Sequence, residues 1–410
     1  MEVAIIGGGP AGLSAALEMA QLPHINWNLY EKKSRISETG GGMSLQTHIW
    51  KLLELNGTAK HIRPTDYFRS PNGLVEQRRN GRSGEVLVTK YEPDSVPRHQ
   101  RSCRLARAKL QGALLKEVDR KRVHVEKRLI AIDHLPNDRN RIRLTFQCGY
   151  IADVDLLVAA DGSRSLVRTL AFPGVVPRYN GQCVYRTIVS KADAEKIEGI
   201  PWGPVFWKNV SGLYVFTCPL GDDDFEVTAR IRRSRSDKDT VSWGQPFDLH
   251  TLLHEFDDFC QPVRDILRLA ARGKTQEFAL CPLPPLERPI SHNIAFVGDA
   301  CHALLGNFGC GVGLALEDVY TLARTLNWAW KRDRSLSDAL GAFHAIRSPH
   351  FKRLYNLMSN FADIKATIRA ESLPTDQEIS VRVQRISEAS QSWMWYYEID
   401  KAVDEFLEAY

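Results

Sequence analysis

The sequence lacks the features of membrane proteins, metal-cluster proteins and disulfide-rich secreted domains. No apolar run approaches the roughly 20 residues that a membrane-spanning helix needs, so we expect no transmembrane segment. The 8 cysteines form no C-x-x-C pair and none stands at zinc spacing from a histidine; we interpret them as free thiols and expect no metal. The first predicted strand begins at residue 2 and leaves no room for a signal peptide, which favours a cytoplasmic protein.

The sequence also lacks an excess of charge of one sign. The formal net charge is +5 over 410 residues, and Lys and Arg are scattered among Asp and Glu. This pattern predicts no binding to nucleic acid. Hydrophobic residues make up 43% of the chain, enough for a sizeable core, and the length predicts two closely joined domains or one large domain. We expect a monomer or a homodimer.

The first residues of the chain are predicted to form a strand, a tight turn, a helix and a second strand. The turn has the spacing G-x-G-x-x-G, with Gly7, Gly9 and Gly12. Gly7 turns the chain, Gly9 lets the backbone approach a pyrophosphate, and Gly12 lets helix and strand pack closely. Glu31 ends the second strand, where a carboxylate binds an adenosine ribose. The unit predicts an ADP-containing dinucleotide but does not distinguish FAD from NAD.

Two later segments also end a predicted strand in an acidic residue. The apolar strand 156–160 ends at Asp161, and a second strand, 294–297, ends shortly before Asp299. A flavin needs more contacts than an ADP group, and Asp299 is placed to accept hydrogen bonds from ribityl hydroxyls. A helix that begins near Gly311 would direct the positive end of its dipole at the flavin ring. These features favour a flavin.

The segments between these motifs are less informative. Glycines in the loop at 39–45 would let the backbone lie against a flat ligand, and residues 64–101 contain one convincing strand, at 85–89. A helix is predicted over 104–118, with Arg107 near its start. Arg107 is either a solvated charge or the cation for a pyrophosphate, and the sequence leaves both interpretations open.

The second half of the chain has a different pattern. Residues 178–290 alternate as short strands and predict a largely antiparallel sheet that could form the floor of a substrate site. The chain is predicted to be helical from 314 onward, with breaks at 348–349 and 373–374. The fold class is α/β: a Rossmann-like domain with an interleaved, mostly antiparallel substrate domain and C-terminal helices. The predicted domains are 1–177 plus 291–345, then 178–290, then a helical region at 346–410.

Three ordered motifs carry a family resemblance. They are the glycine turn, the run at 156–168 that contains Asp161 and Gly162, and Gly298-Asp299-Ala300-Cys301-His302. Together they resemble the fingerprints of the single-component aromatic hydroxylases, the group A FAD-dependent monooxygenases. The chain is most similar to the salicylate-hydroxylase-like branch, which includes fungal enzymes that hydroxylate or dearomatise phenolic metabolites. The branch resemblance also covers residues 40–43, 107–110, 185–186, 317–318 and 393–400.

The resemblance implies a para-hydroxybenzoate-hydroxylase-like fold, bound FAD, and NAD(P)H and O₂ as co-substrates. NAD(P)H would reduce FAD, and a C4a-hydroperoxyflavin would transfer oxygen to a small phenolic or other aromatic substrate. The resemblance places Gly42, Met43, Gly311 and Val312 at the cofactor. It makes Arg186 the candidate for catalysis and for substrate positioning, because a cation there would stabilise a phenolate.

The chain departs from this family beside the expected flavin ring. Cys218 precedes Pro219 where relatives carry a tyrosine, so we take Cys218 as a substrate contact that lacks the usual phenol. Gly306 and the sequence Gly309-Cys310-Gly311 replace a proline and Gly-Gln-Gly. We expect the side chains of His302 and His48 to form structural hydrogen bonds and not to act in catalysis.

Two other functions remain open. The first is an epoxidase or an oxidative-rearrangement enzyme for an alkene or indole, which needs the same cofactor. The second is a non-catalytic protein that binds FAD or another dinucleotide. A halogenase has little support, because the chain lacks a W-x-W-x-I-P stretch.

Overall fold

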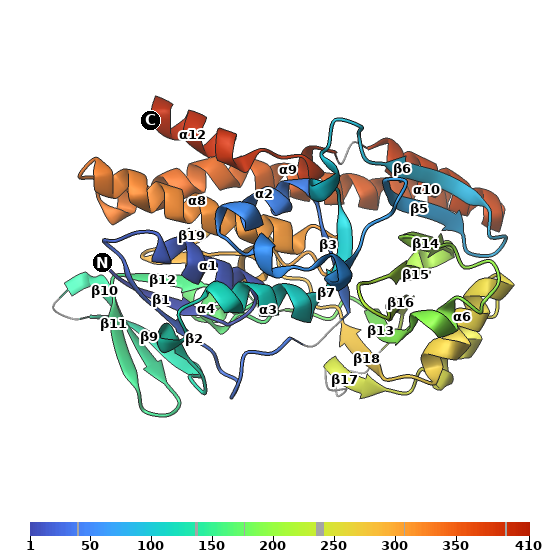
Figure 1. Ribbon diagram of the computed structural model, residues 1–410, viewed down its shortest axis with the longest axis horizontal. Coiled ribbons are helices and arrows are strands. Elements are labelled where there is room, and N and C mark those ends of the chain that lie inside the picture. The colour runs from blue at the N-terminus through green and yellow to red at the C-terminus, as the bar shows by residue number, and fades with distance from the viewer. Residues whose placement is uncertain (39–40, 136–137, 176, 235–241, 307, 390–391) are drawn as a thin grey trace.

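The computed structural model describes residues 1–38, 41–135, 138–175, 177–234, 242–306, 308–389 and 392–410. Figure 1 shows two sheet-containing halves and two long helices, the first of which lies over the first half while the second extends toward the other half. These helices are α8 (Gly311–Lys331) and α9 (Leu336–Ala370). The arrangement confirms the predicted α/β class with C-terminal helices.

The first half contains a mainly parallel sheet with the order β19-β20-β12-β1-β2-β8. Its strands are β1 (Glu2–Ile6), β2 (Asn26–Tyr30), β8 (Val123–His124), β12 (Leu156–Ala159), β19 (Ile290–Ser291) and β20 (Ile294–Phe296). α1 (Pro10–Ala20) connects β1 to β2, and both strands run parallel. All four residues of β12 are buried, because helices cover one face of the sheet and strands 129–135, 138–146 and 151–154 cover most of the other. The predicted strand, turn, helix and strand are therefore confirmed.

The second half contains a mostly antiparallel sheet with the order β17-β18-β13-β16-β15-β14-β5-β6. Its strands are β5 (Leu74–Asn80), β6 (Val86–Tyr91), β13 (Gln182–Ser190), β14 (Val205–Lys208), β15 (Tyr214–Pro219), β16 (Asp224–Arg232), β17 (Trp243–Phe247) and β18 (Thr275–Ala279). One face packs on η6 (Leu249–Phe256) and α6 (Gln261–Ala271) around a core that includes Trp207 and Phe225.

The expectation of a single strand within residues 64–101 was wrong. β5 precedes β6 and joins the second-half sheet by parallel pairing with β14. β5 could not be recognised from the sequence because it is polar: four of its seven residues are Glu, Gln or Arg. β4 (Tyr67–Phe68) also lies in this region.

The helix predicted over 104–118 was also partly wrong. Residues Cys103–Ala106 form β7, which pairs with β3 (Gly42–Leu45), and α3 runs from Arg107 to Glu117. Arg104 therefore lies on a strand and Arg107 is the first residue of a helix. The remaining described elements of the first half include α2 (Thr47–Leu55), β9 (Leu129–Leu135), β10 (Asp138–Phe146), β11 (Ile151–Val154) and α4 (Leu166–Ala171).

The C-terminal helices differ from the prediction at one point. Pro349 lies inside α9 and does not end it, so the break expected at 348–349 was wrong. The helix is held on both sides of the proline by the buried side chains of Arg347 and Phe351, and this packing offsets the one lost hydrogen bond. The break at 373–374 is confirmed, because α10 (Thr375–Glu388) begins after it. α12 (Ile399–Ala409) lies beside α8 (Figure 1).

Candidate cofactor and substrate site

The glycine turn after β1 leaves the start of α1 open. Gly7 has φ +109°, and a Cβ atom on Gly12 would lie 1.9 Å from the carbonyl oxygen of Gly7. These two positions require glycine for backbone reasons. A Cβ atom on Gly9 would meet no atom closer than Glu38 Oε1 at 3.8 Å. Gly9 is also the N-cap of α1 and no side chain caps the helix, so its first N–H groups are available to an anion.

Glu31 follows β2 directly and faces this turn. Its Oε2 accepts a hydrogen bond from the backbone N–H of Gly8 at 2.7 Å, and its Oε1 accepts one from Lys33 at 2.9 Å. The side chain is buried. The backbone thus fixes the carboxylate beside the glycine turn, where the sequence placed it.

Arg107 is brought to the same turn from α3. Its Nε is 3.2 Å from Glu38 Oε2, and the other oxygen of Glu38 is the atom closest to the open side of Gly9. A carboxylate therefore lies over the N-terminus of α1 and is paired with an arginine. This is the arrangement of charges that suits a phosphate, and Glu38 was not anticipated from the sequence.

Asp161 lies where β12 reaches the glycine turn. A Cβ atom on Gly7 would lie 3.0 Å from the Cα of Asp161. Asp161 Oδ2 accepts a hydrogen bond from the backbone of Val167 at 3.2 Å, whereas its buried Oδ1 has no partner within the described residues. Burial raises the pKa of Asp161 above its usual value.

Asp299 and the start of α8 form the next part of the site. Asp299 begins the short helix α7 (Asp299–His302), after Gly298 with φ 59°. A Cβ atom on Gly311 would meet Asp299 Oδ1 at 3.7 Å, so this carboxylate borders the first turn of α8. The N-cap residue Cys310 makes no side-chain cap, and Gly311 and Val312 are partly exposed. Asp299 thus lies beside the uncapped N-terminus of α8.

A buried charge network lies behind this turn. Its members are Glu317, Asp318, Arg347, His302, His48 and His350. Arg347 Nη2 is 2.8 Å from Glu317 and its Nε is 2.9 Å from Asp318, with all three side chains fully buried. Burial alone would raise the pKa of Glu317, but Arg347 and His48 hold it at about 2.

The network fixes the position of the Asp299 turn. Asp318 Oδ2 accepts hydrogen bonds from the backbone N–H of Gly298 at 2.9 Å and from His302 Nε2 at 2.6 Å. His48 lies 3.1 Å from Glu317 and binds the carbonyl of Trp395 at 2.7 Å. The structural hydrogen bonds predicted for both histidines are confirmed. Arg347 could not be assigned to this site from the sequence, because only the packing of α9 on α8 brings it here.

Arg186 lies on β13 and faces the glycine loops of the first half. Its Cδ is 3.4 Å from the Cβ position of Gly41, and its Nη2 is 3.9 Å from that of Gly306. Its guanidinium carbon is 5.5 Å from the ring centre of Phe278, and its buried Nε has no partner within the described chain. Burial lowers the pKa of Arg186, while Glu226 raises it. Arg186 is therefore a cation held at the meeting point of both halves.

Glu226 is a member of this site that the sequence prediction missed. It is buried on β16, accepts the backbone N–H of Gly42 at 3.0 Å and forms a close ion pair with Arg104. Arg104 also donates to Ser44 at 3.0 Å. Burial would raise the pKa of Glu226, but Arg104 and Arg186 lower it below its usual value. The pair ties the β3 loop, which carries Gly42 and Met43, to the second sheet.

Cys218 lies on β15 directly opposite Glu226 and is fully buried. Burial raises the pKa of its thiol. Met43 is also buried, on β3. The first two residues of the predicted loop, 39–40, lie outside the described residues.

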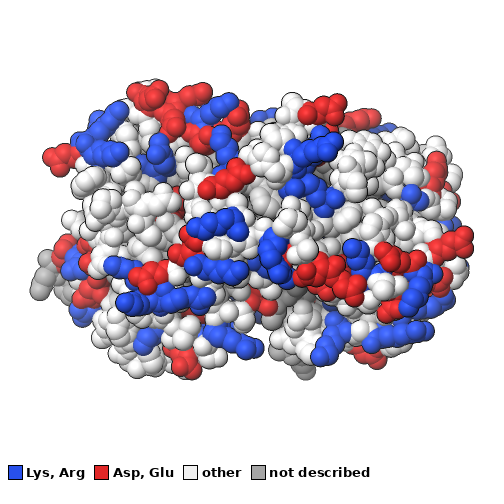
Figure 2. All heavy atoms as spheres, viewed as in Figure 1, with Lys and Arg blue, Asp and Glu red and all other residues white. Residues whose placement is uncertain are grey.

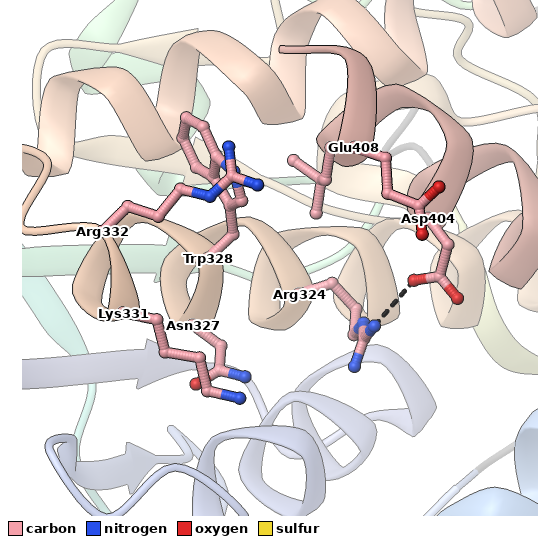
Figure 3. A pocket seen from close by; sticks show the side chains of 8 residues that line it. Arg324, Asn327, Trp328, Lys331, Arg332, Asp404 and Glu408 are labelled. Carbon is pink, nitrogen blue, oxygen red and sulfur yellow. Dashed lines mark hydrogen bonds and ion pairs between the residues drawn. The ribbon is translucent and has the colours of Figure 1, made fainter.

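A surface groove elsewhere does not belong to this site. It lies between α8 and α12 and contains the Arg324 to Asp404 ion pair, 2.6 Å long (Figure 3). Arg324 is 13 residues beyond Gly311, so about 20 Å of helix separates the groove from the start of α8.

Figure 2 shows cationic and anionic side chains interspersed over one face of the molecule. No helix in the described ranges is long and apolar enough to cross a membrane.

Comparisons with known proteins agree with this geometry. The FAD binding domain family matches residues 1–181. Salicylate hydroxylase of Pseudomonas putida is 26% identical over 99% of this chain and 94% of its own length. 6-Methylsalicylate 1-monooxygenase atA of Aspergillus terreus is also 26% identical, over 98% of this chain and 90% of its own.

The fold is shared as well. A salicylate hydroxylase substrate complex matches with a TM-score of 0.79 at 19% identity, over 99% of this chain and 98% of that chain. The architecture is thus that of the para-hydroxybenzoate-hydroxylase-like FAD hydroxylases. Residues 1–181 match an FAD binding domain, and relatives that align with almost the whole chain include a salicylate hydroxylase and a methylsalicylate monooxygenase; both findings support an FAD-dependent monooxygenase.

Proposed function

We propose that the protein hydroxylates, or oxidatively dearomatises, a small phenolic metabolite with FAD, NAD(P)H and O₂. Both relatives described above are named for salicylate or methylsalicylate substrates. The observation that carries the proposal is the position of Arg186, a cation on the substrate sheet that borders the glycine loops of the FAD-binding half. A cation in that place favours the phenolate, which is the electron-rich form of a phenol.

The residues present fit FAD. The helices α1 and α8 have no side-chain cap at their N-termini, and each has a glycine there, Gly9 or Gly311, whose Cβ position meets no atom closer than 3.7 Å. We assign Gly7, Gly9, Gly12 and Arg107 to the pyrophosphate, Glu31 to the adenosine ribose, Asp161 and Asp299 to the ribityl side, and Gly42, Met43, Gly311 and Val312 to the flavin ring.

When bound, FAD supplies the redox chemistry by accepting hydride from NAD(P)H and delivering one oxygen atom of O₂ to the substrate. Arg186 binds and orients the phenolate oxygen in this proposal. The first turn of α8 presents a positive dipole end, and the Arg347 network holds that turn against Asp299. Cys218 is retained as a neighbour of the substrate.

We further propose the division of the chain into 1–177 plus 291–345, 178–290 and 346–410 as its functional domains. β5 and β6 precede residue 178 but extend the substrate sheet through β14. They therefore contribute to the substrate side.

The test is the coupling of NAD(P)H oxidation to product in the Arg186→Gln variant. Losing the charge is expected to raise the substrate KM roughly tenfold, or to divert the reducing equivalents to H₂O₂. Arg268→Gln, at an exposed site on α6, is the control. Unchanged KM and unchanged coupling in Arg186→Gln would contradict the assignment.

A further inference from the structure

A second cation lies on the same face of the substrate sheet as Arg186. Arg186 is opposite Thr228, Thr228 is opposite Phe216, and Phe216 is opposite Phe206. Lys208 is two residues from Phe206 on β14. Side chains two residues apart on a strand point to the same face, so Lys208 and Arg186 share one face of the sheet.

Lys208 is held by aromatic rings rather than by a carboxylate. Its Nζ is 4.1 Å from the ring centre of Tyr214 and 4.5 Å from that of Phe206. Among the residues that the structure describes, it has no hydrogen-bond or ion-pair partner. Cation–π contacts position the ammonium group but leave its donors unused.

The surroundings of Lys208 are rich in positive charge. Arg230 lies directly opposite Tyr214, on the side of Tyr214 away from Lys208, and donates to Gln182 at 3.1 Å. The carboxylate of Glu76, which acts on Lys208, is already paired with Arg78 at 2.8 Å and with Lys90 at 3.2 Å. Burial, followed by the charge of Arg78, lowers the pKa of Lys208 well below its usual value. A partly buried cation in such a field is stabilised by a bound anion.

Arg186 and Lys208 lie at opposite ends of a strip formed by the rings of Phe216 and Phe206. The guanidinium group of Arg186 lies over the ring of Phe278 on β18, whereas the ammonium group of Lys208 lies over rings of β14 and β15. β13 and β14, the strands of Arg186 and Lys208, are three strand spacings apart, roughly 14 Å, and the two residues are also offset by two positions along the strands. Phe216 and Phe206 lie between them with ring centres 4.6 Å apart. A single ring with a carboxylate attached directly to it is too short to reach both cations.

We propose that the substrate carries a carboxylate on an arm, and that Lys208 binds this carboxylate while the reacting ring lies near Arg186. Arg230 adds to the attraction from β16, two strands away from β14. The inference rests on the proposed function, because it deepens the substrate class of the same site. The protein would then accept an aryl-alkanoic acid in preference to the shorter salicylate.

The test compares acids with neutral amides of the same length. Isothermal titration calorimetry of the FAD-loaded protein is performed with ω-(4-hydroxyphenyl)alkanoic acids of increasing chain length, with the matching primary amides, and with salicylate. At the best length the acid is expected to bind roughly tenfold more tightly than its amide. Lys208→Met is expected to bring this ratio close to one. Lys196→Met, which changes a highly exposed lysine on another surface, keeps the ratio.

Lys208→Arg keeps the charge and is expected to retain most of the preference, which guards against a folding defect in Lys208→Met. The inference is overturned if wild-type protein binds acids and amides equally at every length. It is also overturned if the preference survives in Lys208→Met and in Lys208→Met combined with Arg230→Gln. Binding is measured without turnover, so absence of an oxygenated product would count against the proposed function alone.

Discussion

Glu38 and Arg107 form an ion pair over the N-terminus of α1, with Arg107 Nε 3.2 Å from Glu38 Oε2. Glu38 is also the residue closest to the open side of Gly9. The carboxylate thus occupies the place that we assign to the pyrophosphate of FAD. The two members of the pair should consequently have opposite effects on FAD affinity.

Replacing Arg107 with Gln is expected to weaken FAD binding roughly tenfold, because a charge-assisted contact to the pyrophosphate is lost. Replacing Glu38 with Gln is expected to strengthen binding, because a competing anion is removed. Fluorescence quenching of added FAD by the apoprotein measures both dissociation constants. Equal weakening in both variants would mean that Glu38 supports the cofactor rather than competing with it.

Gly12 tests the close packing of α1 on the glycine turn. A Cβ atom there would lie 1.9 Å from the backbone oxygen of Gly7, so Gly12→Ala is expected to destabilise the fold by several kcal/mol, about 3 or more, and to lower flavin content. Gly112 is the matched control in α3, since its Cβ position meets no atom within 4 Å. Gly112→Ala should add about 0.5–1 kcal/mol through helix propensity. Urea unfolding followed by circular dichroism compares the two variants; equal stability would refute the packing argument.

His350 is predicted to make stability depend on pH. Burial lowers its pKa from 6.5 to about 4, so the folded protein keeps it neutral while the unfolded chain is protonated below pH 6.5. Its contribution to stability is full above pH 6.5 and falls as the pH drops toward 4, by on the order of 3 kcal/mol.

Urea unfolding at pH 7, 5.5 and 4.5 measures this slope. His350→Gln removes the titrating group and should flatten the pH dependence in this window, whereas His254→Gln, at an exposed site, should leave it unchanged. An identical slope in His350→Gln and wild-type protein would show that other groups cause the loss.

The cofactor half of the molecule follows from its sequence because its signals are local. The glycine spacing, the apolar strand 156–160 and the acid after each strand are all contained in short segments. Gly12 is required by a contact within its own turn, with the carbonyl oxygen of Gly7, and Gly7 is favoured by its own φ of +109° as well as by the approach of Ala160. Glu31 follows from the same unit, since β2 runs parallel to β1 and ends beside the turn.

The substrate half was less predictable because its contacts join distant segments. β5 is polar and is stabilised as a strand by pairing with β14, about 130 residues later in the chain. Glu226 belongs to an alternating segment in which Phe225 and Val227 face a core. Such alternation usually indicates that the polar side chains face water. Here Glu226 faces Gly42 and Arg104 instead, and only the assembled fold shows this.

The central claim is that the chain binds FAD and uses it to oxygenate an aromatic substrate. The most direct measurement is the visible spectrum of the purified protein on anaerobic addition of NADPH or NADH, followed by air, with a panel of phenols and aryl-alkanoic acids. We predict flavin bands that bleach faster with a suitable phenol, return in air, and yield a product heavier by one oxygen atom. A protein that remains colourless after incubation with FAD, or whose flavin is not bleached by either nucleotide, would contradict the account.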